Sequence, residues 1–287
     1  MTDRFDPERE ELPEAARVRN RSSRFFGNGI KRVEFRFYAG LNDFLPRAKK
    51  QRSFPHSLLG NASVKDLIES QGVPHTEVDL ILVDGRPVGF SHPVQHGDRI
   101  SIYPKFESIE IASLALLRPR PVQEPRFVLD VHLGRLARYL RLLGFDCFYR
   151  NDLVDEELVK IASADQRILL TRDTGLLMRA AVTHGYWLRE IEIHRQVLEV
   201  IRRFDLSRRV APFTRCLLCN GRLQPTEKRE IADQLPQRVA NAFEKFVRCA
   251  ECGKIYWKGS HYDRMARFVT RLYLDGKEAP NAGDGRD

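Results

Sequence analysis

Two short apolar runs in the middle of the chain, Phe127–Asp130 and Arg167–Asp173, predict buried strands, and each delivers an aspartate at its C-terminal end. Helical patterns alternate with these runs, which favours a parallel sheet. The carboxyl ends of parallel strands meet at one edge, where open α/β sheets place their ligands. We therefore expect an α/β fold, a parallel sheet flanked by helices, in which the two aspartates lie close together.

A third acid, Asp155, begins the helical pattern that carries Leu158, Val159 and Ala162 between the two runs. Three converging carboxylates repel one another unless a divalent cation such as Mg²⁺ or Mn²⁺ neutralises them. With no nucleophilic Ser, Cys or His offered nearby, such a cluster favours metal-activated water that attacks phosphorus. The alternative for Asp155 is a simple helix cap.

Two other acids in this region, Asp146 and Asp165, have the sequence context of ordinary turn residues. We therefore leave both of them out of the predicted metal site.

Two CxxC pairs, Cys216 with Cys219 and Cys249 with Cys252, predict a tetrahedral Zn²⁺ site. Two disulfides would need an oxidising compartment, and a redox centre needs only one pair, so neither alternative explains the repetition. Four cysteine ligands leave no open position, so this zinc is expected to be structural. The fifth cysteine, Cys147, lies in an apolar run and is expected to be a reduced core residue.

The chain before residue 107 predicts a separate unit with the order strand, strand, helix, strand, strand. Val33, Phe35 and Phe37 alternate with polar residues, and Ser63 is a plausible cap for a helix over 63–70. Further strands are expected over 79–83 and 98–103, with a turn between them at 84–87.

Several of these segments recur in the same order in one family. They are Phe127-Val-Leu-Asp130, the helix Leu133–Gly144, Leu169-Leu-Thr-Arg-Asp173, the two CxxC pairs and Tyr256-Trp-Lys-Gly-Ser-His261. Over about residues 125–275 the chain resembles the Mut-seven C-terminal RNase family, a PIN-like domain with an appended zinc ribbon. The resemblance implies a metal-dependent ribonuclease with Asp130, Asp155 and Asp173 on the acidic positions of the PIN pattern.

PIN domains usually bring one further acid from a helix, and we identify no counterpart for it in this chain. We therefore expect the three carboxylates to hold one ion firmly, and a second ion only with substrate phosphate present.

The N-terminal unit resembles the β-grasp, ubiquitin-like domain that accompanies this RNase family in some bacterial proteins. Sulfur carriers and protein modifiers of that fold need a C-terminal Gly-Gly, whereas here Tyr103-Pro-Lys-Phe106 continues into more chain. We therefore do not expect a carrier role. The expected role is docking to RNA, to the ribosome or to another RNA-processing protein.

The charge balance favours an anionic polymer such as RNA as a partner. The chain has 48 Lys and Arg against 39 Asp and Glu, a net charge of +9 and a pI near 9.5. Arginines on the helix after Asp130 could grip phosphates, and the ribbon mixes cations with rings that could stack on bases. The alternatives are a solvated helix face and a Trp257 that packs the ribbon core. The candidate RNA-binding residues are Arg135, Arg138, Arg172, Lys254, Trp257, Lys258 and His261.

The predicted layout has seven parts along the chain. They are a disordered tail over 1–30, the ubiquitin-like domain over 31–106, a linker over 107–126, the RNase domain over 127–212, the zinc ribbon over 213–260, a helix over 261–275 and a loose tail over 276–287.

No run of 18 apolar residues and no signal segment is found, so a cytoplasmic protein without a membrane partner is expected. Two functions follow from the sequence. The first is a metal-dependent ribonuclease acting on single-stranded RNA. The alternative is a noncatalytic RNA- or ribosome-binding adaptor.

Overall fold

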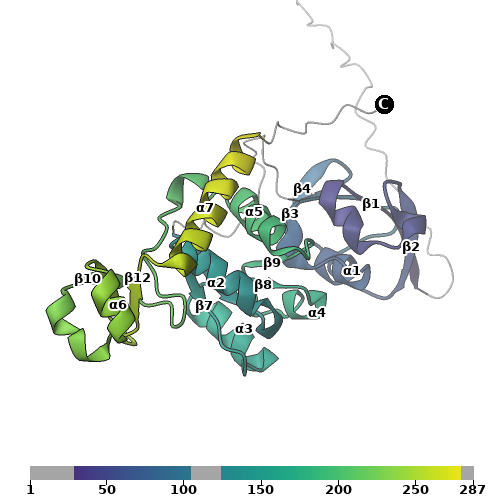
Figure 1. Ribbon diagram of the computed structural model, residues 1–287. Coiled ribbons are helices and arrows are strands. Elements are labelled where there is room, and N and C mark those ends of the chain that lie inside the picture. The colour runs from purple at the N-terminus through teal and green to yellow at the C-terminus, as the bar shows by residue number, and fades with distance from the viewer. Residues whose placement is uncertain (1–28, 105–123, 279–287) are drawn as a thin grey trace, which may run out of the picture.

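The computed structural model describes residues 29–104 and 124–278, which form two sheet domains, a small ribbon and a long final helix (Figure 1). The predicted tail over 1–30 and the linker over 107–126 lie almost entirely outside the described residues, as does most of the predicted tail over 276–287. In the described ranges, the helices are too short or too polar to span a bilayer.

The N-terminal domain has the predicted β-grasp arrangement. Its five-stranded sheet has the order β2-β1-β5-β3-β4, and β1 runs parallel to β5 at the centre. The inward-facing residues Val33, Phe35 and Phe37 are buried as their alternation predicted, and Ser63 caps the helix in a capping box with Asp66. The elements are β1 (Ile30–Phe37), β2 (Phe54–Leu59), α1 (Val64–Ser70), β3 (Val78–Val83), β4 (Arg86–Val88) and β5 (Arg99–Pro104), with short 3-10 turns over Ala39–Phe44, Arg47–Lys49 and His75–Glu77.

The second domain is the predicted parallel sheet flanked by helices. Its strand order is β7-β6-β8-β9, and all three pairings are parallel. Phe127 and Leu129 face α2 and α5, whereas Val128 and Leu169 face α3 and α4, so the strands are apolar on both sides. The elements are β6 (Arg126–Leu129), α2 (Gly134–Leu142), β7 (Asp146–Phe148), α3 (Asp155–Ala164), β8 (Ile168–Thr171), α4 (Thr174–Leu177), β9 (Gly185–Trp187) and α5 (Ile193–Arg203).

The ribbon follows the second domain, and the final helix returns from the ribbon to that domain (Figure 1). On α7, Val269 and Leu272 are buried in the same core as α2 and α5, and the Phe268 ring lies 4.3 Å from that of Tyr139. The ribbon is therefore held at both of its ends. The elements are β10 (Leu223–Thr226), α6 (Gln237–Ala242), β11 (Phe246–Cys249), β12 (Ile255–Trp257) and α7 (Ser260–Glu278).

Both edges of the four-stranded sheet are closed by side chains from neighbouring domains. On the β9 edge, the backbone N–H of Trp187 donates to Glu77 Oε1 of the N-terminal domain at 2.7 Å. On the β7 edge, the N–H of Cys147 donates to Asn220 Oδ1 of the ribbon at 2.9 Å. Each side chain satisfies a strand group that would otherwise be open to another chain.

Arg189 joins the N-terminal domain to the four-stranded sheet. Its guanidinium lies 2.9 Å from Asp43 and 3.4 Å from Glu77, whose side chain is only 3% exposed. The rings of Phe44 and Trp187 lie 4.9 Å from each other, and the guanidinium of Arg189 lies 5.6 Å and 5.3 Å from their centres. The two domains thus share a partly buried, charged interface.

Glu77→Ala is expected to lower the free energy of unfolding by about 3 kcal/mol, because it leaves the guanidinium of Arg189 and the N–H of Trp187 without their buried acceptor. Urea unfolding monitored by tryptophan fluorescence measures this change. Glu34→Ala, which removes an exposed pair with Arg99, is the matched control and should cost less than about 1 kcal/mol. Equal losses in the two variants would contradict this account of the interface.

Candidate functional site

The carboxyl edge of the parallel sheet carries an acidic pocket. Strand β6 has β7 on one side and β8 on the other, so its edge with β8 is the switch point at which open α/β sheets bind ligands. Asp130 follows β6, Asp173 follows β8, and Asp155 is the first residue of α3. The pocket has a volume of about 260 Å³, and its walls are Asp130, Val131, His132, Leu133, Asp155, Arg172, Asp173 and Leu176. The expectation that no histidine lies near the acids was therefore wrong, because His132 lines the same pocket.

Thr171, a buried residue at the end of β8, links two of the acids. Its hydroxyl donates to Asp130 Oδ2 at 2.7 Å and accepts from the backbone N–H of Asp173 at 2.9 Å. This contact orients the Asp130 carboxylate, which is 9% exposed. Sequence reasoning did not identify Thr171, although it is a hydroxyl residue at the end of an apolar strand.

The other two acids differ in how the backbone uses them. Asp173 caps α4, since its Oδ1 accepts from the N–H of Gly175 at 2.7 Å. Asp155 does not act as a cap, because Val154 is the N-cap residue of α3 and Asp155 lies one position inside the helix, with its side chain exposed. Its side chain is therefore available to a ligand in the pocket.

None of these three aspartates forms an ion pair with an arginine or lysine of the described residues, whose ion pairs all involve other carboxylates. Arg172 is exposed at the pocket wall, and its carbonyl accepts from the indole N–H of Trp187 at 3.1 Å. Within the described ranges, the three aspartates are not among the groups whose ligand atoms all lie within 4.8 Å of one another. They share a pocket at a wider spacing.

The four cysteines do come together. Their sulfur atoms all lie within 4.8 Å of one another, with Cys216 to Cys252 at 3.6 Å and Cys219 to Cys249 at 3.4 Å. Zinc–sulfur bonds of about 2.3 Å in a tetrahedron place sulfurs about 3.8 Å apart, so the cluster fits Zn²⁺. All four thiols are free of disulfides, as the zinc interpretation predicted.

The backbone turns of the ribbon leave little space beside the cysteines and supply hydrogen bonds to Cys216. A Cβ on Gly221 would lie 2.9 Å from Cys249 Sγ and 2.4 Å from Glu251 Cγ, so only glycine fits there. Burial opposes ionisation of Cys216, but hydrogen bonds from the Tyr256 hydroxyl and from backbone N–H groups lower its pKa to about 6. A thiolate at this position favours binding of a cation.

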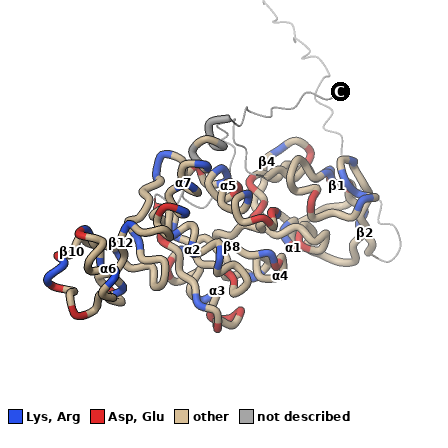
Figure 2. Tube along the Cα trace, in the orientation of Figure 1, with Lys and Arg blue, Asp and Glu red and all other residues tan. Residues whose placement is uncertain are grey.

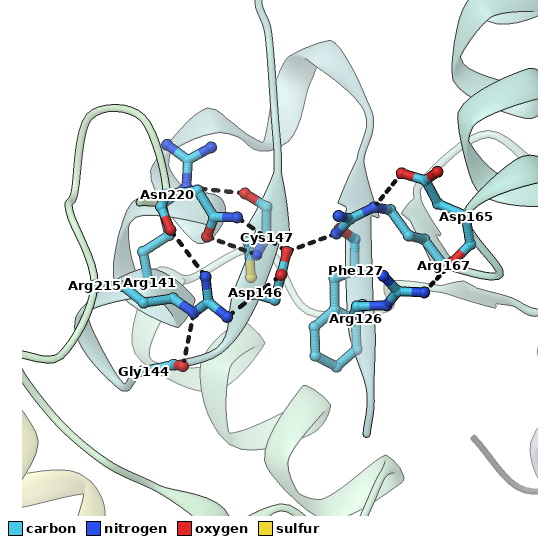
Figure 3. Close-up of polar contacts among 10 residues, drawn as sticks. All are labelled: Arg126, Phe127, Arg141, Gly144, Asp146, Cys147, Asp165, Arg167, Arg215 and Asn220. Atoms are coloured by element: carbon cyan, nitrogen blue, oxygen red, sulfur yellow. Dashed lines mark hydrogen bonds and ion pairs between the residues drawn. The ribbon is translucent and has the colours of Figure 1, made fainter. Parts of the chain in front are cut away.

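A polar network fastens the ribbon to β7, as Figure 3 shows. Asp146 accepts from Arg167 at 2.6 Å, from Asn220 at 2.9 Å and from Arg215 at 3.3 Å. The buried Arg141 donates to the carbonyl of Leu218 at 2.8 Å. The expectation that Asp146 is a turn acid was therefore wrong, because it is the first residue of β7 and pairs with cations from distant segments.

Asp146→Asn is expected to lower the free energy of unfolding by about 3 kcal/mol at pH 7, since two guanidinium groups lose their carboxylate. Burial tends to raise the pKa of Asp146, but hydrogen bonds from Arg167 and Asn220 lower it below its ordinary value. A carboxyl group with a lowered folded-state pKa stabilises the fold above its unfolded pKa of about 4, and this contribution is lost as the pH falls through the folded value.

The stability difference between parent and variant should therefore be constant near neutrality and should shrink in acid. Chemical unfolding at a series of pH values measures it. Asp152→Asn removes an exposed pair with Arg150 and serves as the control. A difference that does not change down to the lowest pH would contradict the assignment to Asp146.

The candidate RNA-binding residues lie on the surface at several places. Trp257 is half-buried beside Gly259, and the other six are exposed. In Figure 2 basic and acidic residues are mixed around the ribbon, and acidic residues mark one end of α3. The exposed candidates are Arg135 and Arg138 on α2, Arg172 at the acidic pocket, and Lys254, Lys258 and His261 on the ribbon and the start of α7.

Comparison with protein-family models shows which family the chain belongs to. The model of the Mut7-C RNAse domain matches residues 125–269, about half of the sequence. The chain belongs to the Mut7-C RNAse domain family. A second model, the Mut7-C ubiquitin domain, matches residues 30–110, and the Mut7-C chain thus has the two-domain arrangement predicted from its sequence. No curated protein matches it.

The region that matches the Mut7-C RNAse domain contains both the acidic pocket and the cysteine cluster. The acids at 130, 155 and 173 and all four clustered cysteines fall between residues 125 and 269. The family name indicates a nuclease-type function with RNA as its substrate.

Proposed function

We propose that this protein is a metal-dependent ribonuclease that hydrolyses phosphodiester bonds of single-stranded RNA at the acidic pocket of its PIN-like sheet. The main support is one observation. Three carboxylates from three separate elements line a single pocket at the sheet's switch point, in a domain that matches an RNase family.

Asp130, Asp155 and Asp173 are the residues that would hold Mg²⁺ or Mn²⁺. The bound ion would supply an activated water for in-line attack and would stabilise the leaving 3′ oxygen. A spacing wider than 4.8 Å is compatible with such an ion, because Mg²⁺ commonly keeps several waters and binds one or two carboxylates together with substrate phosphate. Thr171 holds Asp130 in place, and burial keeps this carboxylate directed at the pocket.

The remaining candidate residues would hold the RNA. Arg172 at the pocket wall can donate paired hydrogen bonds to a phosphate beside the scissile bond. Arg135 and Arg138 extend this positive surface along α2. The zinc site would carry no chemistry, because four sulfurs fill its coordination shell.

Incubation of the purified protein with labelled single-stranded RNA tests this proposal. We expect cleavage with Mn²⁺ or Mg²⁺ and none in buffer freed of both ions, while the bound zinc stays in place. Measurement of the zinc content in both samples separates loss of the catalytic ion from loss of the ribbon. Equal RNA cleavage with and without the added ions would reject the proposed mechanism.

One observation favours the alternative of a noncatalytic RNA- or ribosome-binding adaptor. The three carboxylates are spread more widely than the cysteine ligands, as the limit of 4.8 Å shows. An adaptor would bind RNA or ribosomes without cleaving RNA under any divalent ion. The same assay, combined with a gel-shift measurement of binding, distinguishes the two functions.

A further inference from the structure

A second pocket lies where the ribbon joins the RNase domain. Its volume is about 170 Å³, smaller than the roughly 300 Å³ at which sites for drug-sized ligands begin. It lies between the C-terminal end of α2, strands β11 and β12, and the first turn of α7. Rings and cations dominate its wall, among them Phe213, Lys245, Tyr256, Trp257, Lys258 and Tyr262.

The wall of this pocket is built by contacts between distant segments. The hydroxyl of Tyr256 lies 3.1 Å from Cys216 Sγ and accepts from the N–H of Leu217 at 3.2 Å, so the zinc site fixes this ring. The rings of Phe213 and Tyr262 face each other at 4.5 Å. Phe213 adopts a φ of +61°, a left-handed conformation that is unusual for an aromatic residue and is retained where the surroundings demand it.

The charge around this pocket favours an anionic occupant. Lys245 and Lys258 are exposed at its rim, and neither forms an ion pair with a carboxylate of the described residues. Lys258 Nζ lies 5.4 Å from the centre of the Tyr262 ring. An apolar protein segment would require the rings but not the lysines. An unpaired base with its phosphates uses both.

Helix α2 joins the second pocket to the acidic one. Its N-terminal end follows His132 and Leu133 of the acidic pocket, and its last residue, Leu142, lines the second pocket. The nine residues of α2 span about 13 Å. Arg135, Arg138 and Leu142 share one face of the helix, because residues three, four and seven apart lie above one another. Two exposed arginines thus lie between the pockets.

We propose that the second pocket binds one unpaired nucleobase of the RNA, and that the strand then follows Arg138 and Arg135 to the acidic pocket. This inference rests on the proposed ribonuclease function. The length of α2, about 13 Å, corresponds to about four stacked nucleotides at 3.4 Å each, and to fewer in an extended strand. The pocket would therefore fix which phosphodiester bond enters the acidic site.

The experiment measures binding separately from cleavage. A short single-stranded RNA with one 2-aminopurine base is titrated with the Asp130→Asn protein in buffer without Mn²⁺, and fluorescence quenching reports stacking of the base on a ring. Across probes that carry the 2-aminopurine at different positions, we expect quenching at one position only. Tyr262→Leu should bind the RNA about tenfold more weakly than the Asp130→Asn parent, and Lys258→Ala should also bind it more weakly. Each variant is also checked for its bound zinc, which reports an intact ribbon.

Arg86→Ala, which removes an exposed cation in β4 of the N-terminal domain, is the control and should bind as the parent does. Equal affinity and equal quenching in the parent and in both pocket variants, with zinc retained, would overturn the inference. Failure of the proposed function has a different signature, namely no cleavage by the unaltered protein with Mn²⁺ while quenching still depends on Tyr262 and Lys258.

Discussion

Asp130→Asn is expected to reduce the rate of RNA cleavage by about 10²- to 10³-fold, the usual cost of removing one group that stabilises transition-state charge. Asparagine keeps the shape of the side chain and an oxygen that accepts from the Thr171 hydroxyl, so the fold should not change. The lost negative charge is the one that the proposed ion requires. Initial rates on labelled RNA with saturating Mn²⁺ measure the effect.

Two further variants make this prediction specific. Thr171→Val removes the hydroxyl that orients Asp130 and should cost about tenfold, as expected for a positioning group behind a metal ligand. Extra Mn²⁺ should restore part of its rate, which a purely structural defect would not allow. Asp233→Asn changes an exposed acid in the ribbon and should cleave like the parent. Full activity of Asp130→Asn would remove this carboxylate from the mechanism.

Cys249→Ser is expected to release the zinc and unfold the ribbon. A structural zinc supplies about 10 kcal/mol or more of binding free energy to a small domain, and the ribbon has few other buried residues to replace it. Cys249 is 1% exposed, so a serine hydroxyl there is both a poor ligand and a buried polar group. Zinc content by mass spectrometry and limited proteolysis of residues 213–257 measure the outcome.

The matched control for this substitution is Cys147→Ala. Cys147 is also buried and reduced, but it lies in β7 outside the cluster, and burial raises the pKa of its thiol far above the ordinary value. This variant should keep its zinc. A Cys249→Ser protein that retains both its zinc and its resistance to protease would show that the four sulfurs do not form the metal site.

The features that the sequence predicted well are those encoded by neighbouring residues. Strands β6 and β8 are buried on both faces, which produces continuous apolar runs that are easily recognised. The spacing of each CxxC pair is set by a single turn of backbone, so it too is local. The same holds for the capping box of Ser63 and Asp66.

The features that were missed depend on partners far apart in the sequence. Asp146 resembled a turn residue because Asn220, one of the residues that make it the centre of a network, lies 74 positions away. Glu77 and Arg189 are 112 positions apart, and neither has a local pattern that predicts an interface. The role of Thr171 depends on a contact between two adjacent strands, which becomes visible only once their register is known.

The closure of both sheet edges by side chains from other domains limits how the protein can be divided. A fragment containing only residues 124–206 would leave the outer N–H groups of Trp187 and Cys147 unsatisfied. Each edge of the sheet could then pair with a strand from a second molecule. The unit that folds around this sheet is therefore larger than the sheet itself. The ubiquitin-like domain and the cysteine ribbon cover its two edges and thereby protect it from pairing with a second molecule.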